Sequence, residues 1–414
     1  MPAEAKALTE KRGFDAVVVG GGVIGLACAW RLAQRGAEVA VLERGEPGAG
    51  ATRVAAGMLA PVGELTFGEP ELLELTLEAA RLYPEFVAEL EAATGESTGY
   101  ERLGALHVAL DRDEAAQLRR VHDLQRSLEL EAEWLPPRRC RDLEPGLTPS
   151  FHGGVFAAGE AAIDPRALTR ALLAALSAAG VEVRTETEVV DGIFEGERLV
   201  GVQTVPRSAG PLHRYPEQKS GGLFDRAEAE EIRADHVVLA VGAWSGAMTW
   251  LPEHARPPVR PVKGQVVELR GRDAEPVARH ILASERVYLV PRPDDRLVVG
   301  ATVEELGFDT AVTAGGVHEL LREAYRLLPD VAEMELLGAT AGLRPGTPSN
   351  LPLVGPGAID GLVLATGHFR NGILLAPLAA QAVADLVADG RRSSLVGLGA
   401  TKDERAITEV RQTS

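Results

Sequence analysis

The segment at residues 15–44, DAVVVGGGVIGLACAWRLAQRGAEVAVLER, limits the possible folds of this chain more than any other part of it. A short apolar run, Ala16 to Val19, is typical of a buried strand, an apolar helix follows, and a second strand covers Glu38 to Leu42. Between the first strand and the helix lie glycines in the GxGxxG spacing: Gly20, Gly22 and Gly25. Such a unit predicts a Rossmann-like parallel sheet that binds a dinucleotide.

Each part of this unit has a chemical reason. Gly20 permits the tight turn from strand to helix, Gly22 lets the backbone approach a pyrophosphate, and Gly25 lets helix and strand pack closely. The helix N-terminus adds N–H groups and the positive end of the helix dipole. Glu43, 23 residues after Gly20, ends the second strand and can accept hydrogen bonds from an adenosine ribose. Because FAD and NAD share the ADP half that binds here, this unit alone does not separate them.

Composition narrows the partners of such a site. The chain has 414 residues, of which 45% are hydrophobic and 25% charged, so we expect a globular protein with more than one packing unit. Its 60 acidic residues exceed its 43 basic residues and leave a formal charge of −17. A surface of that sign repels phosphate backbones and anionic headgroups, which disfavours nucleic acid and stable membrane association. A small zwitterion meets no such barrier.

The two cysteines, Cys28 and Cys140, are too few for a disulfide framework and show no metal-ligand spacing, so we expect no metal site. The N-terminal stretch MPAEAKALTEKRGFD carries charges of both signs, which is wrong for a secretory signal. The uncharged run from Ala16 to Trp30 has 15 residues, fewer than the roughly 20 of a membrane span. Together these features predict a cytoplasmic protein.

Other segments predict a second architecture. Apolar residues recur at helical spacing from Glu71 to Thr94, where we expect Pro84 to open a second helix. Asp164 is an N-cap followed by a proline, and Gly180 ends the helix that they begin. Short strands follow one another between Pro258 and Thr302 without intervening helices, which predicts an antiparallel sheet.

The stretch from Pro206 to Ala229 is dense in proline, glycine, serine and charge. It separates two strand-like runs, Val200 to Val205 and Ile232 to Val241. We therefore expect a mobile surface insertion between two strands.

The C-terminal part repeats the pattern of strand, glycine turn and helix. Residues 361–377, GLVLATGHFRNGILLAP, predict an apolar helix that begins near Asn371 and Gly372. The positive end of that helix suits negative charge that develops on the pyrimidine ring of a reduced flavin, a need that an NAD enzyme lacks. The segment Ala55 to Leu59 is too apolar for a solvated loop, so we expect it to lie against a bound group. The helix N-terminus favours FAD over NAD.

Two arginines are candidates for binding an anion. Arg344 lies in the apolar stretch AGLRPGT, and a buried guanidinium needs a planar anionic partner. Arg370 lies where the helix dipole disfavours a cation, a cost of about 0.3–1 kcal/mol that a bound carboxylate could offset. An ordinary salt bridge is the alternative for both arginines.

Three further side chains have two interpretations each. Tyr288 alternates with its neighbours on an expected strand, so it faces either a cavity or the core, and the pattern favours the core. Lys263, in PVKGQ, either touches a flavin or pairs with an acid, and we favour the ion pair. No second polar residue stands at a sequence spacing that would pair it with His368, so we interpret His368 as a group that positions the backbone rather than as a general base.

Taken together, these segments resemble the D-amino-acid oxidase-like family of flavoproteins, and within it the branch that oxidises glycine for the thiazole of thiamine. The resemblance runs from about Phe14 to Ala388. It rests on VVGGGVIGLACAW, AAGMLAP, AIDPRALTRAL, PVKGQ, YLVPR with RLVVGATVEELGFD, AGLRPGT and GHFRNGILLAP, in this order and at similar spacing.

The resemblance implies an α/β plus α+β fold, in which a Rossmann-like FAD-binding domain is interleaved with a substrate domain on an antiparallel sheet. FAD would extend between the two. The implied FAD-binding domain covers residues 14–66, 151–250 and 340–390. The implied substrate domain covers 67–150 and 251–339, with the insertion at 206–229 and a C-terminal tail at 391–414.

Residues that match the family's motifs are implied to contact FAD. They are Gly20, Gly22, Val23, Ile24 and Gly25 at the pyrophosphate, then Glu43, Arg44 and Val189 toward the adenosine, and, around the flavin, Ala51, Thr52, Ala56, Gly57, Met58, His368, Phe369, Arg370, Asn371, Gly372, Ile373 and Leu374.

The same matching implies a substrate pocket. Arg344 matches the arginine that binds the substrate carboxylate, Arg370 the second substrate-side arginine, and Tyr288 the pocket tyrosine. Arg286 and Val303 stand where some relatives have His and Met, a departure that concerns substrate size. A covalent link to the flavin needs a cysteine or histidine near the ring; the two cysteines lie elsewhere and no histidine precedes His107, so we expect non-covalent FAD.

We therefore expect FAD-dependent oxidative deamination of glycine, sarcosine and small D-amino acids. A hydride passes from the α-carbon to flavin N5, O₂ is the acceptor, and glyoxylate (through the imine), ammonia and hydrogen peroxide are the products. Further expected partners are a thiazole synthase and other copies in a homo-oligomer. Two alternatives are open: a D-amino-acid dehydrogenase that donates electrons to a quinone, and a flavin-binding partner without catalysis.

Overall fold

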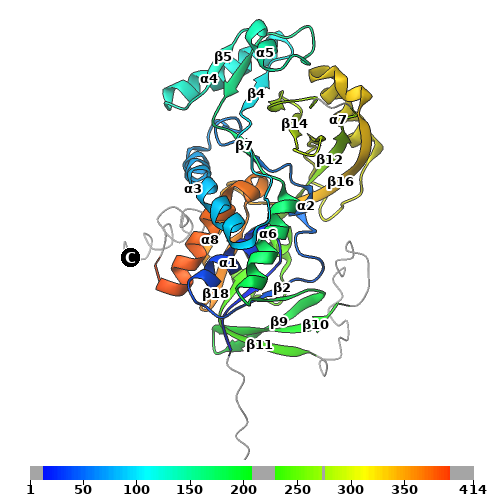
Figure 1. Cartoon of the computed structure of the whole chain (residues 1–414). Coiled ribbons are helices and arrows are strands. Elements are labelled where there is room, and N and C mark those ends of the chain that lie inside the picture. The colour runs from blue at the N-terminus through cyan, green and yellow to red at the C-terminus, as the bar shows by residue number, and fades with distance from the viewer. Residues whose placement is uncertain (1–12, 208–228, 273–275, 392–414) are drawn as a thin grey trace, which may run out of the picture.

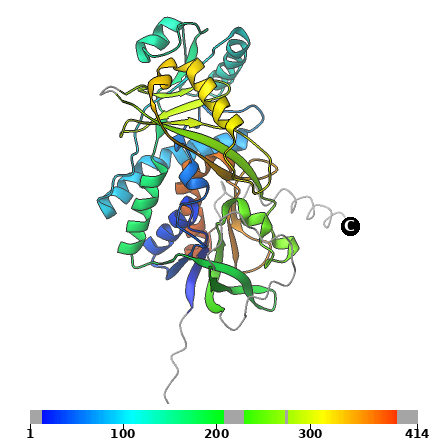
Figure 2. The same ribbon diagram turned by 90° about the vertical axis from the view of Figure 1, so that its right-hand side faces the viewer.

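The computed structural model describes residues 13–207, 229–272 and 276–391 and shows two stacked units, each with an eight-stranded sheet (Figures 1 and 2). Apart from their end residues, the expected insertion at 206–229 and the expected tail at 391–414 lie outside these described residues.

The sheet of the first unit has the strand order β17-β18-β11-β1-β2-β8, and β10 and β9 extend it from β11. Strand β1 pairs in parallel with β2 and β11, and β11 pairs in parallel with β18, as the glycine-rich unit predicts. The bounds are β1 Phe14–Val19, β2 Val39–Leu42, β8 Glu182–Arg184, β9 Thr187–Glu195, β10 Arg198–Pro206, β11 Glu230–Leu239, β17 Leu353–Pro356 and β18 Leu362–Thr366.

Strand β1 is apolar throughout its buried part because both faces of this sheet are covered. Ala16 and Val18 point into the core that the helices share, whereas Val17 and Val19 point into the core on the opposite face. The helices that pack together on the first face are α1 Val23–Gln34, α3 Pro70–Thr94, α6 Pro165–Ala178 and α8 Gly372–Asp389.

The sheet of the second unit has the order β16-β12-β15-β14-β13-β4-β6-β5. Its pairs are antiparallel except for β13 with β4, which confirms the expected second architecture. The bounds are β4 Ala105–Val108, β5 Glu133–Leu135, β6 Gly154–Ala157, β12 Arg260–Arg270, β13 Ile281–Ala283, β14 Tyr288–Pro291, β15 Arg296–Gly300 and β16 Glu335–Gly346.

Side chains alternate across this second sheet. Leu289 points into the core beneath α7, while Tyr288 and Val290 belong to a small cluster on the face toward the first unit. Three helices accompany the sheet, and a short helix and a two-stranded ribbon join the units. They are α4 Arg112–Ser127, α5 Pro137–Leu143, α7 Ala314–Leu327, α2 Ala51–Val54, β3 Met58–Leu59 and β7 Ala161–Ala162.

Residues 70–94 depart from the expectation in two ways. Pro84 opens no second helix, because α3 is continuous across it. A proline inside a helix costs about 3 kcal/mol, and the buried side chains of Tyr83, Phe86 and Leu90 offset that cost by packing into the helical core. The same packing joins α3 to the first unit, although it was expected in the second.

Two other boundaries also shift. Strand β6 pairs with β4 and β5, so residues 154–157 belong to the second sheet rather than the first. Strand β16 pairs with β12 as far as Gly346, which places residues 340–346 in the second sheet as well. These pairings join strands that are distant in sequence, which is why motif boundaries did not reveal them.

The segment Phe369–Asp389, which contains α8, is long and apolar enough to cross a membrane by length and composition, but 67% of its most apolar window is buried. It packs against α1 and α3. This is the burial of a core helix.

Candidate active site

A cavity of about 530 Å³ lies between the two units. The β1–α1 turn, the loop after β2, β9 and the start of α8 line it from the first unit, and β14, β16 and the residues after β15 line it from the second. It collects most of the residues singled out from the sequence: Gly20, Gly22, Val23, Ile24, Glu43, Arg44, Ala51, Thr52, Ala56, Gly57, Met58, Val189, Tyr288, Arg344, His368, Phe369, Arg370, Gly372 and Ile373. Gly25, Asn371 and Leu374 follow lining residues in the sequence but are not part of the lining.

The β1–α1 turn leaves backbone open to the cavity. Gly20 has a φ of +110°, which side chains rarely adopt, and a Cβ on Gly25 would lie 1.9 Å from the Gly20 carbonyl oxygen. A Cβ on Gly22 would meet only Thr52 Oγ1, at 3.6 Å. Gly22 is the N-cap of α1 and has no side chain to cap it, so the first turn presents N–H groups to a ligand.

Glu43 closes the loop at the end of β2. Its carboxylate accepts hydrogen bonds from the backbone N–H groups of Gly21, at 2.7 Å, and Gly45, at 2.9 Å. Beside it, the Arg44 guanidinium stacks on the Trp244 ring, with 4.3 Å from Cζ to the ring centroid. These contacts order the end of the cavity that Val189 also lines.

The loop from residue 51 to residue 58 is held at both ends. The Val23 N–H donates to Thr52 Oγ1 at 3.1 Å, which joins α2 to the start of α1. The buried guanidinium of Arg292 donates to the Ala56 carbonyl, and a Cβ on Gly57 would lie 2.0 Å from the Ile163 carbonyl oxygen. The apolar loop is therefore a fixed wall of the cavity, as its composition indicates.

The turn before α8 brings a second helix N-terminus to the cavity. Asn371 is the N-cap and makes no side-chain cap hydrogen bond, while its N–H donates to the His368 carbonyl at 2.9 Å. Burial lowers the pKa of His368 to about 3, so its ring is neutral. His368 Nε2 is buried without a hydrogen-bond partner among the described residues. A buried polar atom in this position indicates a group that the chain itself does not supply.

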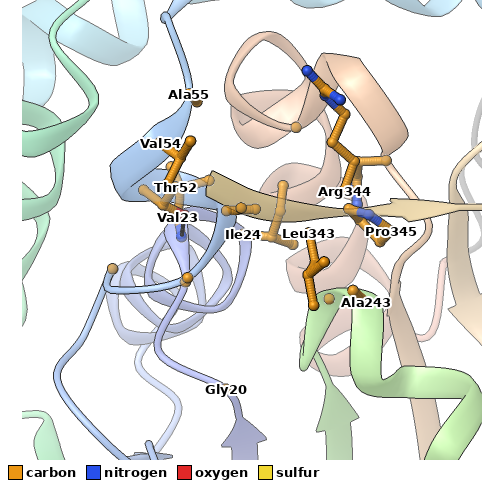
Figure 3. A pocket seen from close by; sticks show the side chains of 18 of the residues that line it. Gly20, Val23, Ile24, Thr52, Val54, Ala55, Ala243, Leu343, Arg344 and Pro345 are labelled. Carbon is orange, nitrogen blue, oxygen red and sulfur yellow. Dashed lines mark hydrogen bonds between the residues drawn. The ribbon is translucent and has the colours of Figure 1, made fainter. Parts of the chain in front are cut away.

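Arg344 extends from β16 on the side opposite Leu343 (Figure 3). Its Nη1 donates to the carbonyls of Thr302, at 3.1 Å, and Lys263, at 3.3 Å. Within the described residues it forms no ion pair with a carboxylate. A cation fixed by carbonyls beside a cavity is suited to a carboxylate ligand.

Tyr288 lies opposite Gly300 in the β14–β15 pair, and a Cβ on Gly300 would lie 2.3 Å from the tyrosine hydroxyl oxygen. The ring therefore occupies space that the glycine leaves. Tyr288 lines the cavity and also packs against a small apolar cluster, so each of its two interpretations holds in part. Burial raises the pKa of its hydroxyl, and the Arg344 charge acts in the opposite direction.

Arg370 has an anionic partner within the chain. Its Nη2 contacts Glu69 Oε2 at 2.8 Å and donates to Thr66 Oγ1 at 3.2 Å. The suggestion that a bound carboxylate offsets its position at the helix N-terminus is therefore corrected, because Glu69 does so. The loop that carries Glu69 lies 301 residues away in sequence, and no local pattern indicates the pair.

Lys263 is fully buried, and its Nζ pairs with Asp309 at 2.9 Å and Glu304 at 3.6 Å, which confirms the ion-pair interpretation. Val303 lines the cavity and is 69% exposed, whereas Arg286 is exposed in the β13–β14 turn and is absent from the lining. Across the described ranges, no group of three or more His, Cys, Asp or Glu side chains is placed to hold a metal.

Sequence reasoning missed Glu64, which lines the cavity near Arg344, Arg370 and Tyr288. It also missed Gly264 and Gly300, which make room for Arg344 and Tyr288. A usable signal existed for Glu64 alone: it is the one charged residue in the run AAGMLAPVGEL.

These features fit an extended FAD. Two helix N-termini whose N-cap residues make no side-chain hydrogen bond, a glycine turn open to the cavity and the unpartnered His368 Nε2 all border one cavity.

Comparison with known proteins agrees with this geometry. A family model described as DAO, FAD dependent oxidoreductase, matches residues 15–386. The glycine oxidase of Geobacillus kaustophilus is 35% identical over 379 residues, which cover 90% of this chain and 93% of the relative. The crystal structure of glycine oxidase from Geobacillus kaustophilus superposes with a TM-score of 0.81 at 32% identity and covers 94% of this chain and 98% of that one.

A further relative is longer than this chain. The Bifunctional protein ThiO/ThiG of Trichormus variabilis is 36% identical over 385 residues, which are 92% of this chain but 54% of the relative. The chain thus spans about half the length of the first curated relatives that it matches.

Proposed function

The chain belongs to the DAO family of FAD-dependent oxidoreductases, and from that premise we propose that it oxidises glycine, and with it sarcosine and small D-amino acids. The net reaction converts glycine, O₂ and water to glyoxylate, ammonia and hydrogen peroxide. The observation that carries this proposal is the position of Arg344. Its guanidinium is held by two backbone carbonyls and has no carboxylate partner among the described residues. It lines the same cavity as the glycine turn and the His368 turn.

Arg344 would bind the substrate carboxylate through two parallel charge-assisted hydrogen bonds. Its own bonds to the Thr302 and Lys263 carbonyls fix the direction of the guanidinium before substrate arrives. Tyr288, from strand β14 of the same sheet, lines the same cavity. Holding the carboxylate in this way would orient the α-carbon hydrogen, which replaces a random encounter by an aligned one.

FAD would be held by the first turn of α1, the Glu43 end of β2, and the His368–Ile373 segment, and when bound it supplies the two-electron acceptor for the α-hydride. The N-terminus of α8, whose N-cap Asn371 makes no side-chain hydrogen bond, would face the ring where negative charge develops. His368 stays neutral at physiological pH, so it would contribute hydrogen bonding and shape rather than charge.

We propose that FAD is bound without a covalent link. Cys28 is buried in α1 and Cys140 is buried in α5, and neither lines the cavity. Burial raises the pKa of Cys28 to about 12 and that of Cys140 to about 11, so both thiols are poor nucleophiles. The same buried free thiols support a cytoplasmic protein, which we propose as its location.

A thiazole synthase is the proposed partner. Relatives named Bifunctional protein ThiO/ThiG extend well beyond the part that matches this chain, which supports a role in which the imine product passes to a thiazole synthase for thiamine. The homo-oligomer expected from the sequence stays a prediction.

Stoichiometry tests the proposed reaction. Purified protein with FAD should consume one O₂ and release one hydrogen peroxide, one glyoxylate and one ammonia per glycine, and the peroxide should disappear when O₂ is removed. If an artificial electron acceptor supports turnover while air yields no peroxide, the chain is a dehydrogenase and the oxidase proposal is wrong.

A further inference from the structure

Glu64 places a carboxyl group in the substrate part of the cavity, and no contact described so far accounts for that position. It lies in the loop that follows β3, where its N–H donates to the Ala60 carbonyl at 3.0 Å. It lines the cavity together with Arg344, Tyr288 and Arg370. Among the described residues its carboxylate has neither a hydrogen bond nor an ion pair.

The backbone that carries Glu64 is fixed. The N–H groups of Val62 and Gly63 donate to Glu160 Oε1, at 2.9 and 3.1 Å, and Gln125 donates to the Val62 carbonyl at 3.0 Å. A Cβ on Gly63 would lie 2.5 Å from His107 Nε2, so the loop packs tightly against the second unit. Glu64 is therefore presented to the cavity by a braced segment.

The pocket brings the carboxyl group of Glu64 near two guanidinium groups. Burial raises the pKa of Glu64, while the guanidinium charges of Arg370 and Arg344 lower it, so both arginines are near enough to act on it. Arg370 is already paired with Glu69. Glu64 and Arg344 thus bring a carboxyl group and a guanidinium to one cavity, and within the described residues neither has an ion-pair partner.

Charges withdrawn from water are costly unless a partner compensates them. An amino acid brings an ammonium and a carboxylate separated by one carbon atom, and so offers a partner to each. A plain carboxylate satisfies Arg344 but leaves Glu64 unpaired beside a second anion.

We propose that Glu64 binds the ammonium group of the substrate opposite Arg344 and so makes the pocket selective for zwitterionic amino acids over simple carboxylates. This inference rests on the proposed function and identifies the residue that recognises the amino end of the substrate. A small zwitterion satisfies both charges of the pocket, whereas acetate, which has the same carboxylate and no amine, satisfies one.

The test compares glycine and acetate on Glu64→Gln, with Glu85→Gln, an exposed position on α3, as the control for the same chemical change. For Glu64→Gln the KM for glycine should rise roughly ten- to a hundredfold, the usual weight of one charge-assisted hydrogen bond. Acetate, measured as a competitive inhibitor, should bind at least as tightly as to the wild type, because the repelling carboxylate is gone. Glu85→Gln should match the wild type for both ligands.

Opposite changes for the two ligands separate recognition from a structural role. Equal weakening of glycine and acetate would show that Glu64 only supports the pocket, and unchanged values for both would show that it does not face the amine; either result overturns the inference. A wild type that oxidises no glycine would instead contradict the proposed function, so the two failures are distinguishable.

Discussion

The guanidinium of Arg344 lies over Gly264: a Cβ atom on that glycine would come to 2.4 Å from Arg344 Cζ and to 2.3 Å from each terminal nitrogen. The two residues belong to the paired strands β16 and β12, in which Gly264 faces Gly342 and Arg344 faces Val262. They are thus diagonal neighbours on one face of the sheet. The missing side chain at Gly264 creates the space in which the guanidinium lies flat.

We therefore expect Gly264→Ala to disturb substrate binding without removing FAD. The added methyl would displace the guanidinium, so the KM for glycine should rise at least tenfold, about 1.4 kcal/mol. Gly338→Ala is the matched control, because Gly338 lies on β16 with open space around it. Steady-state kinetics with both variants check this, and equal kinetics for the two would contradict the packing relationship.

Glu64 should give the pH profile of kcat/KM for glycine an acid limb, that is, a decline at low pH. The charged form of Glu64 is the one that binds an ammonium. Burial raises the pKa of Glu64, and the charges of Arg370 and Arg344 lower it. Tyr288 and Glu160 are the other titratable groups that face it. As pH falls, Glu64 becomes protonated above the ordinary glutamate pKa of about 4.3, and kcat/KM for glycine declines. A pH profile of Glu64→Gln should lack this decline, and an identical acid limb in both proteins would rule out Glu64 as its source.

Glu160 makes folding stability depend on pH. Burial raises its pKa to about 8, although the N–H groups of Val62 and Gly63 oppose the shift. The unfolded chain releases this proton near the ordinary value of about 4.3 and the folded chain holds it until about 8, so its contribution to stability decreases as pH rises through that interval.

Glu160→Gln keeps an oxygen acceptor for both N–H groups and removes the charge. The Tm of this variant relative to that of the wild type should therefore rise from about pH 5 to about pH 8.5. At the alkaline end, the free energy of unfolding of the variant should exceed that of the wild type by on the order of a few kcal/mol. Thermal unfolding at several pH values measures this difference. A difference that is constant with pH would mean that Glu160 does not titrate in this range.

Denaturation tests how FAD is held. Because neither cysteine lines the cavity, unfolding in acid or detergent should release all of the yellow chromophore into the supernatant after the protein is precipitated. Colour that stays with the precipitate would show a covalent link and contradict the proposed non-covalent site.

Local sequence patterns were sufficient for the parts of this protein that local chemistry determines. The glycine turn, the N-cap at Asp164 and the helix that begins at Gly372 follow from residues within a few positions of one another, and the structure has each of them. The alternation of Tyr288 along its strand was also readable, but not which face would border the cavity.

Contacts between distant segments decided the rest. Pro84 lies inside a continuous helix because the core around it outweighs a local helix breaker, and Arg370 pairs with Glu69 across 301 residues. Gly264 and Gly300 matter only because strand pairing brings them beneath Arg344 and Tyr288. No spacing in a single sequence encodes those registers.

The most direct test is a single turnover without oxygen, in which glycine is added to the purified yellow protein and the flavin absorbance near 450 nm is followed. Wild-type protein should lose that band rapidly and regain it when air is admitted. Arg344→Ala should keep its FAD but lose the band only at far higher glycine concentrations. A wild-type band that no small amino acid bleaches, or an Arg344→Ala variant that bleaches as readily as the wild type, would contradict an amino-acid oxidase centred on Arg344.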